Sequence, residues 1–575
     1  MANFIMKRQL INPQTIAEDA SAGLVLGIES IPDGMASGLL AAVNPIYGVY
    51  GYMVGVTTGA LFTSSIFMSV QATGAMSLVV ASVPQVTQSS DPNTTLFALS
   101  ILTGIIMLAA GLLKLGSLIR FVPNSVMVGF INAVAVLIIL GQLDDFTGYS
   151  STGANKVFKA IDLFFNLELV DLPTVMIGFL TIFLILTLEK TSLKALGMVM
   201  ALIVASLVVP LFGWDAVAQV RDIADIPSSL PRPMLPPLSD FLGLIIPAFS
   251  LAFVGLMQGA SITQSVPNPD GDYPDASGDF LGQGVANIAA GLFQGTPVGG
   301  SMSATSIVTN AGARSRFANI SAGIVMAICI LLFGKFIGAI AMPALAGLLI
   351  VVGFRTLKPA QVRMVWKTGL VQQVVMVLTF VAALLIPLQY AVLLGVAMAV
   401  LLFVFQQSNK ITVKAWTLEE GQQLPVESDP PEVVPAEEVT MLLPYGSLFY
   451  AAAPMFEEQL PAVDETSRHA VVIIGLRGET DVGSTFLEVL ARFARSLNEQ
   501  ESKLMLVGLD PNVRDQIERT GVVRDIGREN LFLATDELGR ALLDSLDAAE
   551  KWIAAQESET PEGGIDAAQK ASESP

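Results

Sequence analysis

The chain has 575 residues, of which 53% are hydrophobic and only 14% are charged, and its mean hydropathy is +0.63. Soluble domains carry about a quarter charged residues, so this composition indicates a membrane protein with many spans. The formal net charge of −19 lies mainly in the C-terminal third and argues against nucleic-acid binding. One cysteine and one histidine exclude an internal disulfide framework and a histidine-based metal site.

After an N-terminal cytoplasmic segment over residues 1–20, apolar runs long enough to span or half-span a bilayer recur as far as Gln406. They predict a transmembrane domain over residues 21–410 with two repeats, over about 21–212 and 241–406. The first repeat holds segments 21–41, 47–64, 72–84, 95–113, 124–142, 172–188 and 195–212. The second holds segments 241–260, 279–293, 300–310, 319–334, 339–353, 372–386 and 388–406. Because each repeat has an odd number of segments, the second is inverted relative to the first.

The third segment of each repeat is short and interrupted. The first is QATGAMSLVVASV (71–83), and the second is GGSMSATSIVTN (299–310), which follows Pro297. A helix that breaks at bilayer depth must line a cavity, because unpaired backbone groups are costly in hydrocarbon. Paired interruptions at corresponding positions are typical of a transporter's substrate site. Two half-helices with their amide ends in one cavity predict an anion site. A Gly/Pro turn in an extramembrane loop is the alternative.

The distribution of basic residues sets the orientation. With the N-terminus inside, fourteen basic residues fall in predicted cytoplasmic loops and five in outer loops, so both termini are predicted to be cytoplasmic. The inner set is Lys7, Arg8, Lys114, Arg120, Lys190, Lys194, Arg314, Arg316, Arg355, Lys358, Arg363, Lys367, Lys410 and Lys414. The outer set is Lys156, Lys159, Arg221, Arg232 and Lys335.

The composition changes after the last apolar run. Residues 411–437 are acidic and rich in proline, which is typical of a linker. Alternating strand-like and helix-like segments over 438–552 predict a small cytoplasmic α/β domain. Residues 553–575 have the composition of a disordered tail.

Several motifs in this order resemble the SulP family of sulfate-permease-type anion transporters with a C-terminal STAS domain. The motifs are IPDGMASG (31–38), NPIYGVYGYM (44–53), RFVPNSVMVGFINAVAVLIILGQL (120–143), LGQGVANIAAGLFQGTPVGGSMSAT (281–305) and MPALAGLLIVVGF (342–354). The resemblance covers roughly residues 15–550. It implies an α-helical polytopic protein with a fourteen-segment 7+7 inverted repeat, divided into a core domain and a gate domain. It also implies a homodimer and elevator-type movement of the core against the gate.

The resemblance also places the substrate between the N-termini of the third and tenth helices. The positions that correspond to it are Thr73, Gly74, Ala75, Gly300, Ser301, Met302 and Ser303. Two half-helix dipoles and nearby hydroxyls can hold a small oxyanion without a full positive charge. The alternative role for Ser301, Ser303 and Thr305 is packing between helices.

Two positions depart from the family pattern. Ala304 stands where many relatives carry an arginine, which lowers the field at the site, and Gln258 stands where cation-coupled relatives often carry an acid. The first span instead contains Glu29 and Asp33, four residues apart. Intramembrane carboxylates are costly and are functional candidates, so we assign these two acids and Gln258 to cation coupling, with Na⁺ or a proton. The alternative is that both acids lie near the membrane surface or pair with Asn132 or a backbone amide.

The predicted function is secondary active transport of a small inorganic anion, bicarbonate or sulfate, across the plasma membrane (the inner membrane of a bacterium). An anion channel, or an exchanger of chloride or a dicarboxylate, is the alternative. A nucleobase carrier of the same fold would need acids at the positions of Gln258 and Met302. No nucleophile–base set or phosphate loop indicates an enzyme, and no cofactor is expected apart from Na⁺ as a coupling ion. A regulatory partner could bind the STAS domain, although Gly483 replaces the phosphorylatable residue of regulatory STAS domains.

Overall fold

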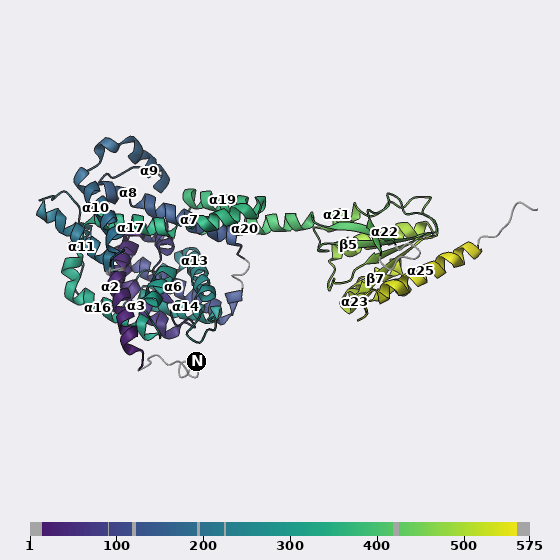
Figure 1. The fold of residues 1–575 in the computed structure, drawn as a ribbon, viewed down its shortest axis with the longest axis horizontal. Helices are drawn as coiled ribbons and strands as arrows, with labels where there is room; N and C mark the ends of the chain where they lie inside the picture. Colours follow the sequence, from purple (N-terminus) through teal and green to yellow (C-terminus); the bar gives the residue numbers. More distant parts are fainter. Residues whose placement is uncertain are drawn as a thin grey trace, which may run out of the picture. The chain divides into compact units, whose positions relative to one another are not determined.

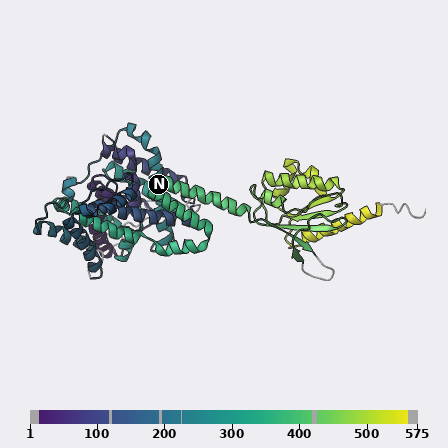
Figure 2. The same cartoon turned by 90° about the horizontal axis from the view of Figure 1, so that it is seen from above.

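The computed structural model describes residues 14–89, 91–117, 122–191, 196–223, 226–417 and 425–559. The chain divides into two compact units, Met1–Ala399 and Val400–Pro575. The first unit is helical, and the second contains a six-stranded sheet with helices on both faces (Figures 1 and 2).

Every one of the fourteen apolar segments contains a helix at the predicted place. The first repeat forms α2 (Ile16–Leu40), α3 (Pro45–Phe62), α4 (Gly74–Ala81), α6 (Pro92–Leu112), α7 (Asn124–Gly141), α10 (Leu172–Leu188) and α11 (Leu196–Leu211). The second repeat forms α13 (Ile245–Ser265), α14 (Ala276–Leu292), α15 (Met302–Asn310), α16 (Phe317–Ile337), α17 (Met342–Thr356), α19 (Leu370–Leu385) and α20 (Leu388–Ser408). Shorter elements connect them: α5 (Pro84–Thr87), α8 (Leu143–Thr147), α9 (Lys156–Phe165), η2 (Leu167–Leu169), α12 (Val220–Ile223), η3 (Leu238–Leu244) and α18 (Pro359–Thr368).

The helices differ in whether they can cross a membrane alone. Within the described residues, six stretches have the length and hydropathy of a complete span, and they contain α6, α7, α13, α16, α17 and α20. Helices α10, α11 and α19 are apolar but shorter. At 1.5 Å per residue, the eight residues of α4 and the nine of α15 reach only about 12–14 Å. Both therefore end inside the protein rather than spanning the bilayer.

The helices pack into two bundles. Helices α2, α3, α4, α6, α13, α14, α15 and α16 pack mainly on one another and form the core bundle, while α7, α10, α11, α17 and α19 form the gate bundle. Small residues allow close approach within the core bundle. A Cβ at Gly104 of α6 would lie 2.6 Å from the carbonyl oxygen of Gly284 of α14, so neither helix tolerates a side chain there.

A buried polar network joins the predicted cytoplasmic ends of the core helices. The Asp279 carboxylate on α14 accepts hydrogen bonds from the backbone N–H of Ser65 (2.7 Å) and from the Thr263 hydroxyl on α13 (2.7 Å). The Arg316 guanidinium donates to the carbonyl oxygen of Ala60 at 2.8 Å. The Asp19 carboxylate of α2 accepts the backbone N–H of Arg314 at 2.6 Å. Since Asp19 and Asp279 are 0% exposed and Arg316 only 4% exposed, these bonds fix the helix ends to one another.

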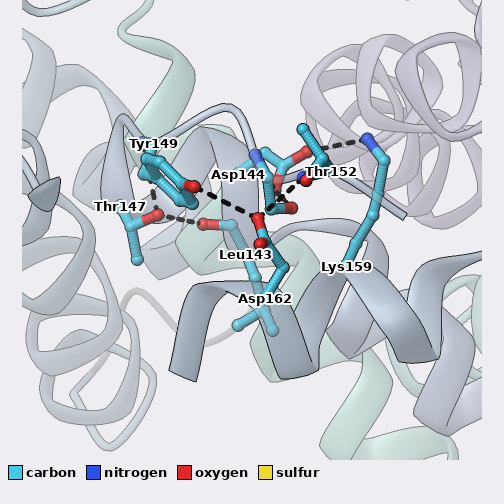
Figure 3. A network of polar contacts seen from close by, with 8 residues as sticks. Leu143, Asp144, Thr147, Tyr149, Thr152, Lys159 and Asp162 are labelled. Carbon is cyan, nitrogen blue, oxygen red and sulfur yellow. Dashed lines mark hydrogen bonds and ion pairs between the residues drawn. The ribbon is translucent and has the colours of Figure 1, made fainter. Parts of the chain in front are cut away.

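Helix α9 is amphipathic and lies on the predicted outer side of the gate bundle. On its polar face, Lys159 Nζ contacts Asp144 Oδ2 of α8 at 3.0 Å, and Asp162 Oδ2 accepts the Thr152 N–H at 2.8 Å and the Tyr149 hydroxyl at 3.1 Å (Figure 3). Large apolar side chains on α9 are exposed: Phe158, Ile161, Phe164 and Phe165. The polar contacts therefore attach α9 to α8 and to the loop that precedes it.

The second unit contains a sheet in the order β4-β3-β5-β6-β7-β8. Its strands are β3 (Thr412–Thr417), β4 (Val426–Ser428), β5 (Val439–Tyr445), β6 (Val471–Gly475), β7 (Lys503–Leu509) and β8 (Leu531–Leu533). Strands β5 to β8 are parallel, and β3 and β4 are antiparallel additions. Its helical elements are α21 (Ala453–Glu457), α22 (Ser484–Glu499), α23 (Pro511–Thr520), α24 (Val523–Ile526), η4 (Arg528–Asn530) and α25 (Arg540–Glu559).

Two boundaries predicted from the sequence in this region are wrong. The segment 411–437 is not a linker, because β3 and β4 lie in it and β3 pairs with β5 through Ala415 and Leu442. The residues over 553–575 are not all disordered, because α25 continues to Glu559. Ile553 is buried against the sheet together with Ala549. The remainder of that predicted tail, residues 560–575, lies outside the described residues, as do residues 1–13 of the predicted N-terminal segment.

Candidate functional site

The two interrupted segments meet in a short antiparallel ladder. Strand β1 (Ser69–Gln71) pairs with β2 (Gly299–Ser301), with Val70 opposite Gly300. Helix α4 begins three residues after β1 ends, and α15 begins directly after β2. The ladder therefore brings the N-termini of both half-helices to one place within the core bundle, as the sequence predicted.

Each half-helix is capped by a hydroxyl that precedes it. Thr73 Oγ1 accepts the Met76 N–H at 3.3 Å, and Ser301 Oγ accepts the Ala304 N–H at 3.3 Å. The other N–H groups of a first helical turn have no partner within the helix. In α4 these belong to Gly74 and Ala75, and in α15 to Met302 and Ser303. They are donors that a small anion can accept without displacing a helical hydrogen bond.

The predicted substrate residues differ in exposure. Ser303 is exposed, and the Met302 side chain is 39% exposed, so the N-terminus of α15 is accessible. Thr73 and Gly74 are half-buried, whereas Ala75 is buried. Gly300 is also buried, and a Cβ there would lie 2.8 Å from the Cα of Gly259 on α13. Gly300 therefore permits the close approach of β2 to α13.

Gln258 is the predicted coupling residue that joins this site. Its Oε1 accepts the Thr73 hydroxyl at 2.7 Å, so α13 is hydrogen-bonded to the cap of α4. A small cavity adjoins it between the two bundles, lined by Met127, Phe130, Ile131, Phe253, Val254, Met257, Gln258 and Val392. Gly74 also faces the gate, because a Cβ there would lie 2.7 Å from Ile138 Cδ1 of α7. The site thus borders the surface along which core and gate meet.

Asp33 and Glu29 lie on the neighbouring helix α2. Asp33 Oδ2 accepts the hydroxyl of Tyr52 on α3 at 2.7 Å. Glu29 is only 6% exposed, and its Oε2 has no hydrogen-bond partner among the described residues. No hydrogen bond within that part of the chain joins either acid to Thr73 or Ser301. The structure therefore brings Gln258 to the half-helices and places the two acids beside them on α2.

Helix α2 is nevertheless connected to the half-helices. Gln71 Nε2 of β1 donates to the Ser30 hydroxyl at 2.8 Å, and the hydroxyls of Ser37 and Ser77 lie 2.7 Å apart. Ser30 neighbours Glu29 in sequence. A shift of the acids on α2 can therefore reach the ladder and α4 through two direct polar contacts.

Amide side chains that the sequence analysis did not single out hold the ladder in place. On α14, Asn287 donates to the carbonyl oxygen of Val298 at 2.6 Å and accepts its N–H at 2.8 Å. One turn earlier, Gln283 Oε1 accepts the Gly300 N–H at 3.0 Å. Asn319 of α16 accepts the Ser69 hydroxyl at 2.7 Å in the same way. The pattern that could have revealed two of them is the pair of amides four residues apart on one face of an apolar helix.

Two other polar residues have structural roles. Thr305 accepts the Ser69 N–H at 3.1 Å and donates to the Ser301 carbonyl oxygen at 2.7 Å, so it connects α15 to β1. Asn132 accepts the Lys358 N–H at 3.0 Å within the gate and does not bond Glu29 or Asp33. Ala304 is buried with Ala22 and Leu26 of α2, among other apolar residues, so its side chain packs on α2.

The comparisons with known proteins agree with this architecture. The model of the sulfate permease family matches residues 16–379, and that of the STAS domain matches residues 430–538. The candidate sulfate transporter YvdB of Bacillus subtilis (strain 168) is 26% identical over 533 residues, which cover 92% of this chain and 98% of that protein. Murine Slc26a9, an anion transporter solved in the inward-facing state, superimposes with a TM-score of 0.83 at 19% identity, covering 96% of this chain and 93% of that chain. The transmembrane domain of the cyanobacterial bicarbonate transporter BicA gives a TM-score of 0.57 at 21% identity, covering 68% of this chain and 98% of that chain.

Proposed function

Because the chain belongs to the sulfate permease family, whose members are anion transporters, we propose that it is a secondary active transporter of a small inorganic anion. The observation that carries the proposal is the β1–β2 ladder, which directs the first-turn amides of α4 and α15 to one site. Hydrogen bonds from neutral amides and hydroxyls hold an anion without a fixed countercharge. A carrier needs such moderate affinity, since it must release what it binds.

Bicarbonate and sulfate are the substrates that we propose to test first. Relatives of this chain are named for sulfate, and the BicA structure is named for bicarbonate. Because position 304 is an alanine, the site lacks the fixed positive charge that would favour a divalent anion. The Ala304 side chain is buried against α2, so the donors at the site are neutral. This slightly favours a monovalent anion. The alternatives are channel-like conduction and the exchange of chloride or a dicarboxylate. A nucleobase carrier is disfavoured, because positions 258 and 302 are glutamine and methionine rather than acids.

We propose that transport is coupled to Na⁺ or H⁺ through Asp33, with Glu29 and Gln258 beside it. Asp33→Asn removes the ionisable group, and uptake should then lose its dependence on the cation gradient. Tyr52→Phe is the matched control, because it deletes the hydrogen bond to Asp33 but keeps the carboxyl group, and it should keep the gradient dependence. If Asp33→Asn retains the full dependence on the Na⁺ or pH gradient, Asp33 is not the coupling group.

The two-bundle architecture supports an elevator-type mechanism. The buried network of Asp19, Asp279 and Arg316 holds the core helices together, so the core can move as one body against the gate and carry the ladder with it. Together with this mechanism we propose a homodimer in the plasma membrane with both termini in the cytoplasm. The STAS domain is then placed where a cytoplasmic regulatory partner could reach it.

Uptake into liposomes tests the function directly. Purified protein should take up labelled bicarbonate or sulfate, and the rate should respond to an imposed Na⁺ or pH gradient. Ser303→Pro removes one first-turn N–H of α15, and its control Ser303→Ala keeps it. We expect the proline variant alone to lose uptake. Currents far above carrier turnover would instead select the channel alternative, and uptake that is equal in both variants would refute the amide site.

A further inference from the structure

Helix α18 (Pro359–Thr368) connects α17 to α19 and has two different faces. Its Val362 and Val365 side chains pack on Val128 of α7 and Met376 of α19. Trp366 lies on its outward side and is 54% exposed. An amphipathic helix with cations and an exposed tryptophan is typical of a segment in the membrane interface.

Three cations lie on or next to this helix. Lys358, Arg363 and Lys367 are exposed, and no ion pair is found for them among the described residues. Arg363 and Lys367 are four residues apart, so they occupy the same side of α18. Their charge is therefore free to attract an anionic group.

A cavity of about 490 Å³ opens beside these cations. Its lining residues combine apolar surface with two positive charges and one amide: Asn132, Leu357, Pro359, Val362, Arg363, Trp366 and Lys367. A free inorganic anion would use only the charges and gain nothing from Leu357, Val362 or Trp366. An amphiphile with an anionic head uses both parts of the cavity.

The helix that follows α18 carries exposed apolar side chains. Leu370, Val374, Val377 and Val381 form one exposed apolar stripe along α19, with spacings of four, three and four residues. A hydrocarbon chain can therefore lie along α19 while its head stays at α18. We propose that this cavity binds an anionic phospholipid, with the phosphate at Arg363 and Lys367 and the glycerol and upper acyl carbons against Trp366.

The position of the cavity suggests a consequence for transport, which rests on the proposed function and on the proposed cytoplasmic orientation. Asn132 lines the cavity and accepts the Lys358 N–H at 3.0 Å. It belongs to α7, whose Ile138 faces Gly74 and whose Phe130 lines the cavity at Gln258. A lipid bound at α18 thus contacts the gate helix that borders the anion site.

The test uses the full-length protein in vesicles of phosphatidylcholine with or without phosphatidylglycerol, and it measures lipid retention by native mass spectrometry. The wild type should retain phosphatidylglycerol in preference to phosphatidylcholine. Replacing both Arg363 and Lys367 by glutamine should weaken this binding about 30-fold, since each basic residue contributes about fivefold. The control replaces Lys114 and Lys190 by glutamine, which also removes two positive charges, but at other places on the predicted cytoplasmic face.

A second readout locates the lipid. Brominated phosphatidylglycerol should quench the tryptophan fluorescence of the wild type more than that of Trp366→Phe. The proposal is overturned if the glutamine pair keeps the preference, if the control pair loses it equally, or if glycerophosphoglycerol without acyl chains competes as well as the lipid. Because binding is measured without transport, a failure here is distinct from a failure of the proposed anion transport.

Discussion

Asn287→Leu tests whether the ladder of β1 and β2 is required for transport. Asn287 is 0% exposed, and its amide makes two hydrogen bonds, of 2.6 and 2.8 Å, to the backbone of Val298, which is also 0% exposed. Leucine has a similar volume but leaves both Val298 groups without partners. A buried group left in this way costs about 1–3 kcal/mol, so the pair predicts a loss of about 2–6 kcal/mol.

This loss should appear at the site, because Val298 immediately precedes β2. If a loss of about 2 kcal/mol, the lower end of this range, acts on the position of β2, the kcat/KM of anion uptake should fall about 30-fold. The assays are initial uptake rates in liposomes over a range of anion concentrations and unfolding by SDS titration. Thr181→Val is the control, since that buried hydroxyl bonds only the Ile177 carbonyl oxygen of its own helix. The reasoning is refuted if Asn287→Leu and the control variant have the same uptake rate and the same stability.

Two further predictions concern single side chains. Thr73→Val removes both the helix cap and the hydrogen bond to Gln258. The two losses of about 1 kcal/mol each should together raise the KM of uptake about 30-fold, and an unchanged KM would contradict this. Burial, and then the charge of Lys159, lower the pKa of Lys156, the first residue of α9, from 10.5 to about 8. Because the folded state holds this proton less tightly than the unfolded chain, the stability of the folded state should rise as the pH increases from 8 towards 10.5. Acetylation of Lys156 followed by mass spectrometry should show a midpoint near 8, and a midpoint near 10.5 would show that the amine is not buried.

The spans were predictable because hydrophobicity over fifteen or more residues is a local signal. The interruptions were also predictable, since glycine and proline mark them. The β3 and β4 strands were not, because they are short and lie next to acidic, proline-rich sequence. Only the pairing of β3 with β5, and of β4 with β3, makes them strands. The predicted end of the α/β domain at residue 552 falls inside α25, because charged residues separate the buried positions of this helix, such as Ala549 and Ile553.

The contacts that build the site could not be derived from local pattern. Gln283, Asn287 and Asn319 act on backbone atoms of other segments, and no property of their own neighbourhood identifies those partners. Asp33 could be recognised as an intramembrane acid, but its partner Tyr52 depends on how α2 packs against α3. Sequence reasoning located the half-helices, and tertiary packing decides which side chains support them.

The ladder also constrains how the chain is made. Ser69 pairs with Ser301, so the ribosome must add 301 − 69 = 232 residues before β1 meets its partner. At about 5–20 residues per second, this takes roughly 10–50 s. During that interval the newly inserted first repeat carries an unpaired strand edge, which hydrocarbon does not tolerate. The insertion machinery or trapped water must therefore shelter β1 until the second repeat arrives, and a stall between the two repeats would leave a product exposed to membrane quality control.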